Sequence, residues 1–316
     1  MRRIISLFSG VGGIELPFVK NEFAVVFAND FEPKAIKTYN LNFEINALCA
    51  DISKINPDNI PDGDILVGGF PCQPFSVAGY RKGFEDTRGT LFFNVCKILE
   101  AKRPAVVLLE NVKNLVSHDS GKTFEVILNS LENLGYHVKH AVLNACEYGN
   151  MPQNRERIYI VGFLNASHYK NFEFPNPVRL KTSLADLLDF KSKVDDKYYY
   201  TKKKYPRIYN AFTKEKPIKG VVYQWRRQYV RANKSNLCPC LTANMGTGGH
   251  NVPLIYTDYG LRKLTPRECF NVQGFPKSYK LPTDLADSAL YKQAGNSVCV
   301  GVIDRIAENI IKAMEQ

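Results

Sequence analysis

Cys72 has the surroundings of a catalytic thiol. It lies in the string VGGFPCQPFS at positions 67–76, directly after the apolar segment 64–67. An apolar run that ends in Gly-Gly and Pro-Cys predicts a buried strand followed by a loop with a thiol at its tip. The glycines let a ligand approach the backbone, and Pro71 fixes one dihedral and removes an amide donor beside the sulfur. The alternative is a buried structural cysteine, which would need neither the Gly-Gly before it nor the Gln-Pro-Phe-Ser after it.

Two further segments place charged side chains beside predicted strands. Residues 104–109 are apolar and end in Glu110, and a carboxylate at the carboxyl end of an interior strand faces the ligand crevice. The alternative for Glu110 is structural, as a helix cap or as the partner of Lys113. The segment QNRER at 153–157 leads into another apolar strand, and we expect its two arginines, Arg155 and Arg157, to point to opposite faces. One of them can reach an active site while the other packs or meets phosphate.

The first thirty residues predict a nucleotide-binding turn. A strand at 3–8 is followed by SGVGG at 9–13 and then by a helix from Ile14. Glu15 stands where the dinucleotide fingerprint has its third glycine, so a pyrophosphate is not the obvious ligand. Asp30 ends the next strand about twenty residues after Gly10, the distance at which a carboxylate meets a ribose diol. S-adenosylmethionine is a nucleoside cofactor without a diphosphate, and we expect it here.

These motifs together resemble those of the small bacterial cytosine-5 DNA methyltransferases of restriction-modification systems. The shared elements are Pro-Cys-Gln after Gly-Gly-Phe, Glu-Asn-Val at 110–112 and the QNRER segment, in the order of the family. Nearly the whole chain takes part, apart from residues 191–255. The resemblance implies an α/β fold, a Rossmann-like S-adenosylmethionine-dependent methyltransferase sheet with helices on both faces, plus a smaller irregular target-recognition lobe.

The resemblance also implies a reaction, the methylation of cytosine C5 within a specific short duplex DNA sequence. Cytosine C5 is too poor a nucleophile to attack a sulfonium methyl until a thiolate adds to C6 and N3 is protonated. At matching positions Cys72 makes the attack, Glu110 serves N3 and Arg157 serves O2, while positive charge from Arg155 or Arg157 favours the thiolate. The target base must be rotated out of the duplex. We expect the enzyme to protect host DNA in a restriction-modification system.

Cofactor contacts are carried over at matching positions. In the family, Phe31 would lie against the adenine, Asp51 and Ile52 would read the adenine edge, and Leu91 would contact the cofactor; Asp51 could instead be only a helix cap. The predicted cofactor-binding residues are Phe8, Gly10, Val11, Gly12, Gly13, Asp30, Phe31, Asp51, Ile52, Pro71, Leu91, Asn296 and Val298.

The net charge of +11 lies in one segment. Residues 191–255 contain 14 Lys and Arg against 3 Asp and Glu, while the rest of the chain contains 28 of each. Tyrosines and Trp225 accompany the positive residues, a mixture suited to phosphates and to stacking on bases. The alternative is a solvated basic face. We therefore expect double-stranded DNA as the partner, a target-recognition domain at 181–255, and a catalytic and cofactor-binding domain at 1–180 completed by 256–316.

Two glycine-rich stretches are assigned to DNA. Residues 77–90 predict a mobile loop that closes over DNA, with Gly79, Gly83 and Gly89 as hinges. Ala78 replaces a serine of some family members, which leaves open what fills the emptied base stack. Residues 242–251 predict a loop that reads base edges. The predicted DNA-binding residues are Gln73, Ser76, Arg88, Arg226, Arg227, Thr242, Asn244, Gly246, Gly248 and Gly249.

Other features restrict the class of protein. An apolar run near 18 residues and a signal-peptide pattern are both absent, which predicts a cytoplasmic, nucleoid-associated protein without membrane contact. The eight cysteines form no C-x-x-C pair, and Cys238 and Cys240 offer at most two ligands of a structural zinc site, so we expect no metal. Scattered lone thiols fit a reducing compartment. We expect the protein to act as a monomer.

Three rival functions can be weighed against the sequence. A tRNA cytosine-5 methyltransferase of the DNA-methyltransferase-like subfamily shares the Pro-Cys-Gln core, but the long basic, glycine-rich segment is typical of enzymes that read DNA sequence. A catalytically dead DNA-binding regulator would have lost Cys72, Glu110 or Arg157, and all three are present. A thiol oxidoreductase would need a resolving cysteine near position 72.

Overall fold

The computed structural model describes residues 1–71, 91–233 and 235–316, which form two compact units. Unit 1 comprises Met1–Leu143, Glu156–Asn176 and Ile303–Gln316, and unit 2 comprises Asn144–Arg155 and Pro177–Val302. The predictions made for Cys72, Gln73, Ser76 and Arg88, and for the loop at 77–90 with its three hinges, lie outside the described residues.

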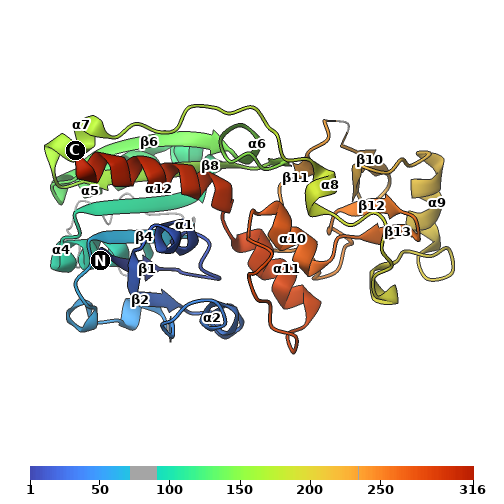
Figure 1. Cartoon of the computed structure of the whole chain (residues 1–316), viewed down its shortest axis with the longest axis horizontal. Helices are drawn as coiled ribbons and strands as arrows, with labels where there is room; N and C mark the ends of the chain where they lie inside the picture. Colours follow the sequence, from blue (N-terminus) through green and yellow to red (C-terminus); the bar gives the residue numbers. More distant parts are fainter. Residues whose placement is uncertain (72–90, 234) are drawn as a thin grey trace. The chain divides into compact units, whose positions relative to one another are not determined.

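Unit 1 is built around a seven-stranded sheet in the order β3-β2-β1-β4-β5-β8-β6 (Figure 1). Neighbouring strands from β3 to β5 are parallel, and β8 runs antiparallel to β5. The predicted apolar runs form these strands, and the expected mixed α/β fold class is confirmed. The strands are β1 (Arg3–Leu7), β2 (Ala24–Asp30), β3 (Leu48–Cys49), β4 (Ile65–Gly69), β5 (Val106–Val112), β6 (His137–Asn144) and β8 (Glu156–Phe163).

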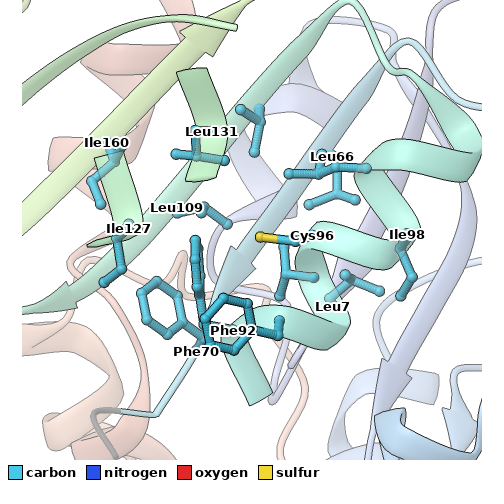
Figure 2. Close-up of a cluster of buried hydrophobic side chains, with 14 of the residues drawn as sticks. Leu7, Leu66, Phe70, Phe92, Cys96, Ile98, Leu109, Ile127, Leu131 and Ile160 are labelled. Carbon is cyan, nitrogen blue, oxygen red and sulfur yellow. The ribbon is translucent and has the colours of Figure 1, made fainter. Parts of the chain in front are cut away.

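Helices cover both faces of this sheet. Alternate residues of each strand point to opposite faces, and both sets are buried, as Ile4 and Leu7 of β1 illustrate. On one face, α4 and α5 pack onto Leu66, Leu109 and Ile160 (Figure 2). The helical segments are α1 (Glu15–Lys20), α2 (Pro33–Asn40), η1 (Ile52–Lys54), η2 (Pro57–Asn59), α4 (Leu91–Lys102), η3 (Lys113–Gly121), α5 (Lys122–Asn133), α7 (Ala166–Asn171) and α12 (Val300–Glu315), the last from Ile303 onward.

The parallel strands place several predicted site residues at one edge of unit 1. Leu7 pairs with Asn29 on one side and with Gly68 on the other, and Gly69 pairs with Glu110. The carboxyl ends of β1, β2, β4 and β5 therefore lie at the same edge, which is where open α/β sheets bind ligands.

Unit 2 contains a four-stranded antiparallel sheet in the order β10-β9-β12-β13. Helix α9 covers it through Ile208 and Phe212, which pack with Tyr223 and Leu254. A second, two-stranded sheet joins β7 and β11 in parallel. The elements are α6 (Ala145–Tyr148), β7 (Gln153–Asn154), α8 (Leu184–Leu187), η4 (Asp196–Tyr198), α9 (Pro206–Lys214), β9 (Val222–Trp225), β10 (Val230–Ala232), β11 (Cys238–Pro239), β12 (Leu254–Thr257), β13 (Gly260–Lys263), α10 (Pro266–Val272) and α11 (Asp287–Asn296).

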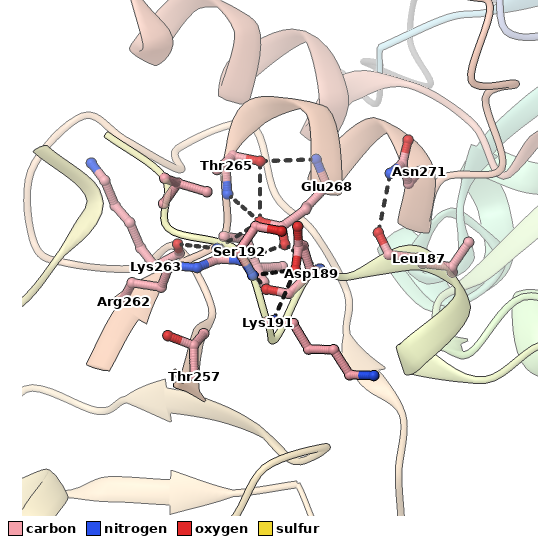
Figure 3. Close-up of polar contacts among 12 residues, drawn as sticks. Leu187, Asp189, Lys191, Ser192, Thr257, Arg262, Lys263, Thr265, Glu268 and Asn271 are labelled. Atoms are coloured by element: carbon pink, nitrogen blue, oxygen red, sulfur yellow. Dashed lines mark hydrogen bonds and ion pairs between the residues drawn. The ribbon is translucent and has the colours of Figure 1, made fainter. Parts of the chain in front are cut away.

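A buried ion pair joins β13 to α10 in unit 2. Arg262, which is fully buried, donates to both carboxylate oxygens of Glu268 at 2.7 Å (Figure 3). Glu268 also completes a capping box with Thr265, the N-cap of this helix. Glu268 thus caps α10 and pairs with Arg262 of β13, and the two interactions together hold the start of α10 against the small sheet.

The two units differ from the predicted domain boundaries at two places. Unit 2 begins again at Pro177, near the predicted start at 181, but it also includes residues 144–155 and 256–302, which we assigned to the catalytic domain. The capping box and the Arg262–Glu268 pair explain the inclusion of residues 256–302, because they attach α10 to the small sheet. Among the residues described, there is no helix with the length and apolar character needed to cross a bilayer.

Candidate active site

The end of β4, which leads to Cys72, is held by a neighbouring strand of unit 1. Asn111 donates its side-chain amide to the carbonyl of Phe70 at 2.8 Å, and both side chains are buried. Phe70 also packs against Phe92 of α4. Asn111 belongs to the Glu-Asn-Val motif, but we had not assigned it a function. Its contact fixes the main chain two residues before Cys72, while Pro71 is exposed.

Glu110 and Arg157 form an ion pair at the same edge. The Nε of Arg157 lies 3.1 Å from Glu110 Oε1, and the side chains are 14% and 10% exposed. Lys113, the structural partner considered for Glu110, instead pairs with Glu156 at the surface. The pair joins two of the predicted catalytic residues. A carboxyl and a guanidinium side by side supply a proton donor and a cationic hydrogen-bond donor for a polar ring.

The glycine turn after β1 is closed by Asp30. Gly10 N–H donates to Asp30 Oδ2 at 2.8 Å, and Glu32 N–H donates to Oδ1 at 2.9 Å. Gly10 and Gly12 both have positive φ, and a Cβ on Gly12 would lie 2.0 Å from the Phe43 ring, so glycine is required there. Burial raises the pKa of Asp30 above its ordinary value.

The remaining residues of this turn differ in exposure. Phe8 is half-buried with a positive φ, and Val11 and Gly13 are buried. Phe31, the residue predicted to lie against adenine, is 67% exposed, although an aromatic ring of this size is usually covered. An uncovered aromatic ring next to the half-buried Asp30 carboxylate is suited to a nucleoside.

Glu15 is a buried carboxyl beside the glycine turn. It is 1% exposed and accepts a hydrogen bond from the Ser6 hydroxyl at 2.5 Å. Burial raises its pKa to about 7 and outweighs the opposing effect of the Ser6 hydrogen bond. The sequence analysis recorded Glu15 only as a departure from the dinucleotide fingerprint.

Asp51, Ile52 and Leu91 also belong to unit 1. Asp51 is the N-cap of η1 and accepts from Ser53 N–H at 2.9 Å. This cap, together with the Ser53 hydroxyl, lowers the pKa of Asp51. Ile52 is buried in the hydrophobic core of unit 1, and Leu91 is the half-buried first residue of α4. Their cofactor contacts stay predictions.

Arg155, Asn296 and Val298 belong to unit 2. Arg155 is 2% exposed and donates to the main-chain carbonyls of Leu241, Gly295 and Ser297. Its side chain is thus hydrogen-bonded to main chain, whereas Arg157 faces Glu110 in unit 1. Asn296, the last residue of α11, is exposed, and Val298 is buried. The two arginines have different surroundings, as expected, but alternation is not the cause, because residues two apart share one face of a regular strand. Arg155 lies in the break between β7 and β8, whereas Arg157 belongs to β8.

Two segments of unit 2 that are distant in sequence enclose a pocket of about 460 Å³. One is the tip of the β9–β10 hairpin, where Arg227 has a positive φ. The other is residues 242–251, here called the glycine-rich loop. Five residues of the predicted DNA-binding set line the pocket, together with Trp225 and two further residues of the loop, which that set did not name. The lining residues are Trp225, Arg226, Arg227, Asn244, Thr247, Gly248, Gly249 and Asn251.

Cation–π contact and hydrogen bonds support the walls of this pocket. The Arg207 guanidinium lies 5.7 Å from the centre of the Trp225 ring. Asn251 and Thr247 both donate to the carbonyl of Asn244, which shapes the loop. Thr242 is exposed outside the pocket, and Gly246 packs on Tyr291 of α11. The sequence signal that could have pointed to Trp225 as a pocket residue is its position directly before two arginines.

Most cysteines that the structure describes are unsuited to nucleophilic chemistry. Burial raises the pKa of the thiols of Cys96, Cys238 and Cys269, and that of Cys299 to about 11. Such thiols stay protonated near neutral pH and react slowly. In the described ranges, His, Cys, Asp and Glu side chains do not gather in groups of three or more that could hold a metal ion.

The chain is similar to known proteins over almost its whole length. The family model described as "C-5 cytosine-specific DNA methylase" matches residues 2–312. Type II methyltransferase M.Bsp6I of Bacillus sp. (strain RFL6) is 56% identical over 316 residues, covering 99% of this chain and 100% of that protein. Type II methyltransferase M.HhaI of Haemophilus parahaemolyticus is 41% identical over 319 residues, covering 98% and 94%.

Solved structures share the fold at lower sequence identity. The crystal structure of S. pombe Dnmt2 methyltransferase superposes with a TM-score of 0.74 at 22% identity and covers 100% of both chains. The match of the family model over almost the entire length, together with relatives above 40% identity, identifies the chain as a member of the C-5 cytosine-specific DNA methylase family, an enzyme that methylates cytosine C5 in DNA.

Proposed function

We propose that this methyltransferase uses S-adenosyl-L-methionine to methylate one cytosine within a short duplex DNA sequence, and that it protects host DNA in a restriction-modification system. The observation that carries the proposal is the Glu110–Arg157 pair at the strand edge that also leads to Cys72. Relatives named as Type II methyltransferases support the restriction-modification context.

The cofactor fits the residues of the glycine turn. Asp30 offers a half-buried carboxylate to a ribose diol, and the exposed Phe31 ring offers a face to a purine. We therefore propose that Phe8, Gly10, Asp30 and Phe31 hold S-adenosylmethionine, with Asn296 and Val298 assigned from the family resemblance. When bound, this cofactor supplies an electrophilic methyl group.

Three side chains are proposed to activate the cytosine. The Cys72 thiolate forms a bond to C6, and Glu110 gives a proton to N3, so the negative charge that the thiolate brings into the ring is neutralised and C5 becomes nucleophilic. Arg157 donates a hydrogen bond to O2 and, through its pair with Glu110, keeps that carboxyl in place. After C5 has received the methyl group, loss of the C5 proton expels the Cys72 sulfur and restores the aromatic ring.

The DNA assignments rest on the pocket of unit 2 and on the charge of that unit. We propose that Arg226, Arg227, Asn244 and the glycine-rich loop read base edges, because arginine pairs with guanine and asparagine with adenine in the major groove. The exposed lysines at 202–204 are proposed to meet phosphates.

A methylation map tests the function. Bisulfite sequencing of DNA from cells that express the protein should reveal 5-methylcytosine at one recurrent sequence, and the purified protein should transfer tritiated methyl groups to duplexes that contain it. Equal or greater transfer to tRNA would instead favour the tRNA methyltransferase considered above. The solved relatives under 25% identity share only the fold and do not favour that alternative.

A further inference from the structure

Three buried polar side chains of unit 2 form a network between two functional segments. Gln153, Arg155 and Gln273 are 0%, 2% and 0% exposed. The first segment is the glycine-rich loop, and the second is residues 295–298, which contain the predicted cofactor contacts. Buried polar groups are costly unless hydrogen-bonded, so a satisfied network of this kind specifies one arrangement of the segments that it joins.

Arg155 is the centre of this network. Its Nη1 donates to the carbonyl of Leu241 at 2.9 Å, directly before the glycine-rich loop. Its Nη2 donates to the carbonyl of Gly295 at 3.2 Å and to that of Ser297, the two neighbours of Asn296. Because the guanidinium is a planar fork with fixed donor directions, one side chain sets the position of both segments.

A second path runs through the two glutamines. Gln153 accepts from Leu241 N–H at 3.2 Å and donates to Gln273 Oε1 at 3.0 Å. Gln273 in turn donates to the carbonyls of Ala294 at 2.6 Å and Ser297 at 3.4 Å. Leu241, the residue that precedes the loop, is therefore connected to the end of α11 by two chains of hydrogen bonds, one through Arg155 and one through Gln153 and Gln273.

Direct backbone packing reinforces these hydrogen bonds. A Cβ on Gly295 would lie 2.2 Å from the Thr242 carbonyl and 2.5 Å from Ala243 N, so the loop rests on the helix without an intervening side chain. Further along, a Cβ on Gly246 would lie 2.7 Å from the Tyr291 ring. Packed interiors do not deform continuously, so a displacement of the loop is transmitted to the end of α11.

We propose that Arg155 is a positioning residue that couples recognition of the DNA sequence to binding of the cofactor. A cognate duplex that orders the glycine-rich loop holds Leu241 and Gly295 in place, and the segment around Asn296 is then preorganised for S-adenosylmethionine. The inference rests on the proposed function, which assigns the loop to DNA and residues 296 and 298 to the cofactor. Linkage requires that the two ligands strengthen each other by the same factor.

Calorimetry on the full chain measures this factor. The probe is S-adenosylhomocysteine, titrated without DNA, with a duplex that contains the mapped methylation site, and with a duplex of scrambled sequence. For the unaltered protein, the cognate duplex should tighten binding of the probe by about 5- to 150-fold, and the scrambled duplex should not. In Arg155→Lys, the charge remains but the fork is lost, and the factor should fall close to one.

Arg262→Lys is the matched control. Arg262 is also a fully buried arginine of unit 2, and its guanidinium donates to the carbonyls of Lys263 and Asp189 as well as to Glu268 (Figure 3). These partners lie outside both coupled segments. This variant should unfold at a lower temperature while it retains the coupling factor of the unaltered protein.

A second variant keeps the test decisive if Arg155→Lys does not fold. Gln273→Met preserves the volume of the side chain but removes its hydrogen bonds to Ala294 and Ser297, so it should reduce the coupling factor while Arg155 stays in place. An unchanged factor in both variants overturns the proposal, as does an equal loss in Arg262→Lys. An unaltered protein that methylates DNA without any coupling refutes only this inference, whereas one that neither methylates DNA nor binds the probe refutes the proposed function with it.

Discussion

Arg157 and Glu110 lie on the same face of the antiparallel pair β5–β8, with Arg157 Nε 3.1 Å from Glu110 Oε1. The register pairs Arg157 with Val112, so the two charged side chains meet diagonally across the strands. The parallel neighbour β4 ends beside Glu110 and continues through Phe70 and Pro71 to Cys72. The arrangement places a carboxyl at the strand end where we propose that cytosine N3 is protonated.

Glu110→Gln tests this carboxyl. The amide keeps the size of the side chain but cannot deliver a proton to N3, so the single-turnover rate of methyl transfer should fall by about 10²- to 10⁴-fold. The affinity for S-adenosylhomocysteine should stay the same. The control is Glu156→Gln, which breaks the exposed Lys113–Glu156 pair and should leave the rate unaltered. A Glu110→Gln protein with the original rate would show that N3 is protonated by another group.

Covalent attack by Cys72 can be trapped. On a duplex that carries 5-fluorocytosine at the target, the C5 substituent cannot leave as a proton, so the sulfur remains bonded to C6. With S-adenosylmethionine present, the unaltered protein should form an adduct that survives denaturing electrophoresis, and Cys72→Ala should form none. Cys49→Ala, which removes an exposed thiol, should form as much adduct as the unaltered protein. An adduct with Cys72→Ala would assign the attack to a different residue.

Local patterns predicted the strands and the turn of this site, because their signals lie within a few residues. The apolar run before Glu110 became β5, and the spacing of Gly10 and Asp30 became a hydrogen bond of 2.8 Å. The expected difference between Arg155 and Arg157 is present, but it does not come from alternation, because residues two apart share one face of a regular strand. It arises because the chain leaves the strand at Arg155, between β7 and β8, and the residue that meets Glu110 depends on the register of β8 against β5.

Contacts between distant segments were beyond sequence reasoning. Trp225 and Asn251 line the same pocket only because the β9–β10 hairpin folds against the glycine-rich loop. The local sequence of neither segment indicates that the two segments meet. The network around Gln273 depends likewise on three separate stretches of chain. The inclusion of residues 256–302 in unit 2 follows from the Arg262–Glu268 pair, which composition did not indicate.

Replacement of Asp30 should weaken cofactor binding. Asp30→Asn keeps an oxygen for Gly10 N–H but loses the charge, and a ribose diol would then lack one strong acceptor. We expect a loss of about 1–3 kcal/mol in affinity for S-adenosylmethionine by calorimetry. Asp64→Asn is the control, because Asp64 also accepts a main-chain N–H, from Arg3 at 2.6 Å, just before β4. An unchanged affinity in Asp30→Asn would place the ribose elsewhere.

Glu15 should make stability depend on pH. Its pKa in the folded protein is about 7, against an ordinary value of 4.5, so the folded state binds more protons between these values. The contribution of Glu15 to the free energy of unfolding is therefore fully present below about pH 4.5 and is lost as pH rises to about 7. At about 1.4 kcal/mol per unit, the loss is on the order of 3 kcal/mol.

Urea unfolding checks this prediction at about pH 5 and about pH 8. Glu15→Gln carries no charge at either pH and should lose less stability between them than the unaltered protein. Glu22→Gln, at an exposed position just after α1, should lose as much as the unaltered protein. Equal losses in Glu15→Gln and the unaltered protein would show that Glu15 does not ionise in this range.

Residues of unit 2 that contact phosphates and residues that contact bases should have different effects on the salt dependence of DNA affinity. The logarithm of DNA affinity falls with the logarithm of salt concentration by roughly 0.9 for each phosphate contacted. Alanine at the exposed Lys202, Lys203 and Lys204 together should flatten this slope by up to roughly 2.7 without changing the methylated sequence. Arg227→Ala in the pocket should relax the recognised sequence at one position, at a cost of about 1–3 kcal/mol in discrimination.

Fluorescence anisotropy over a salt series measures the slope, and bisulfite sequencing of a randomised duplex pool measures the recognised sequence. The two variants serve as controls for each other, because phosphate contacts position the protein and base contacts specify the site. The decisive observation is a hybrid that carries residues 181–255 of a relative with a different specificity. A hybrid that still methylates the original sequence would mean that bases are read outside this segment, and the basic residues of 191–255 would then hold the DNA without choosing its sequence.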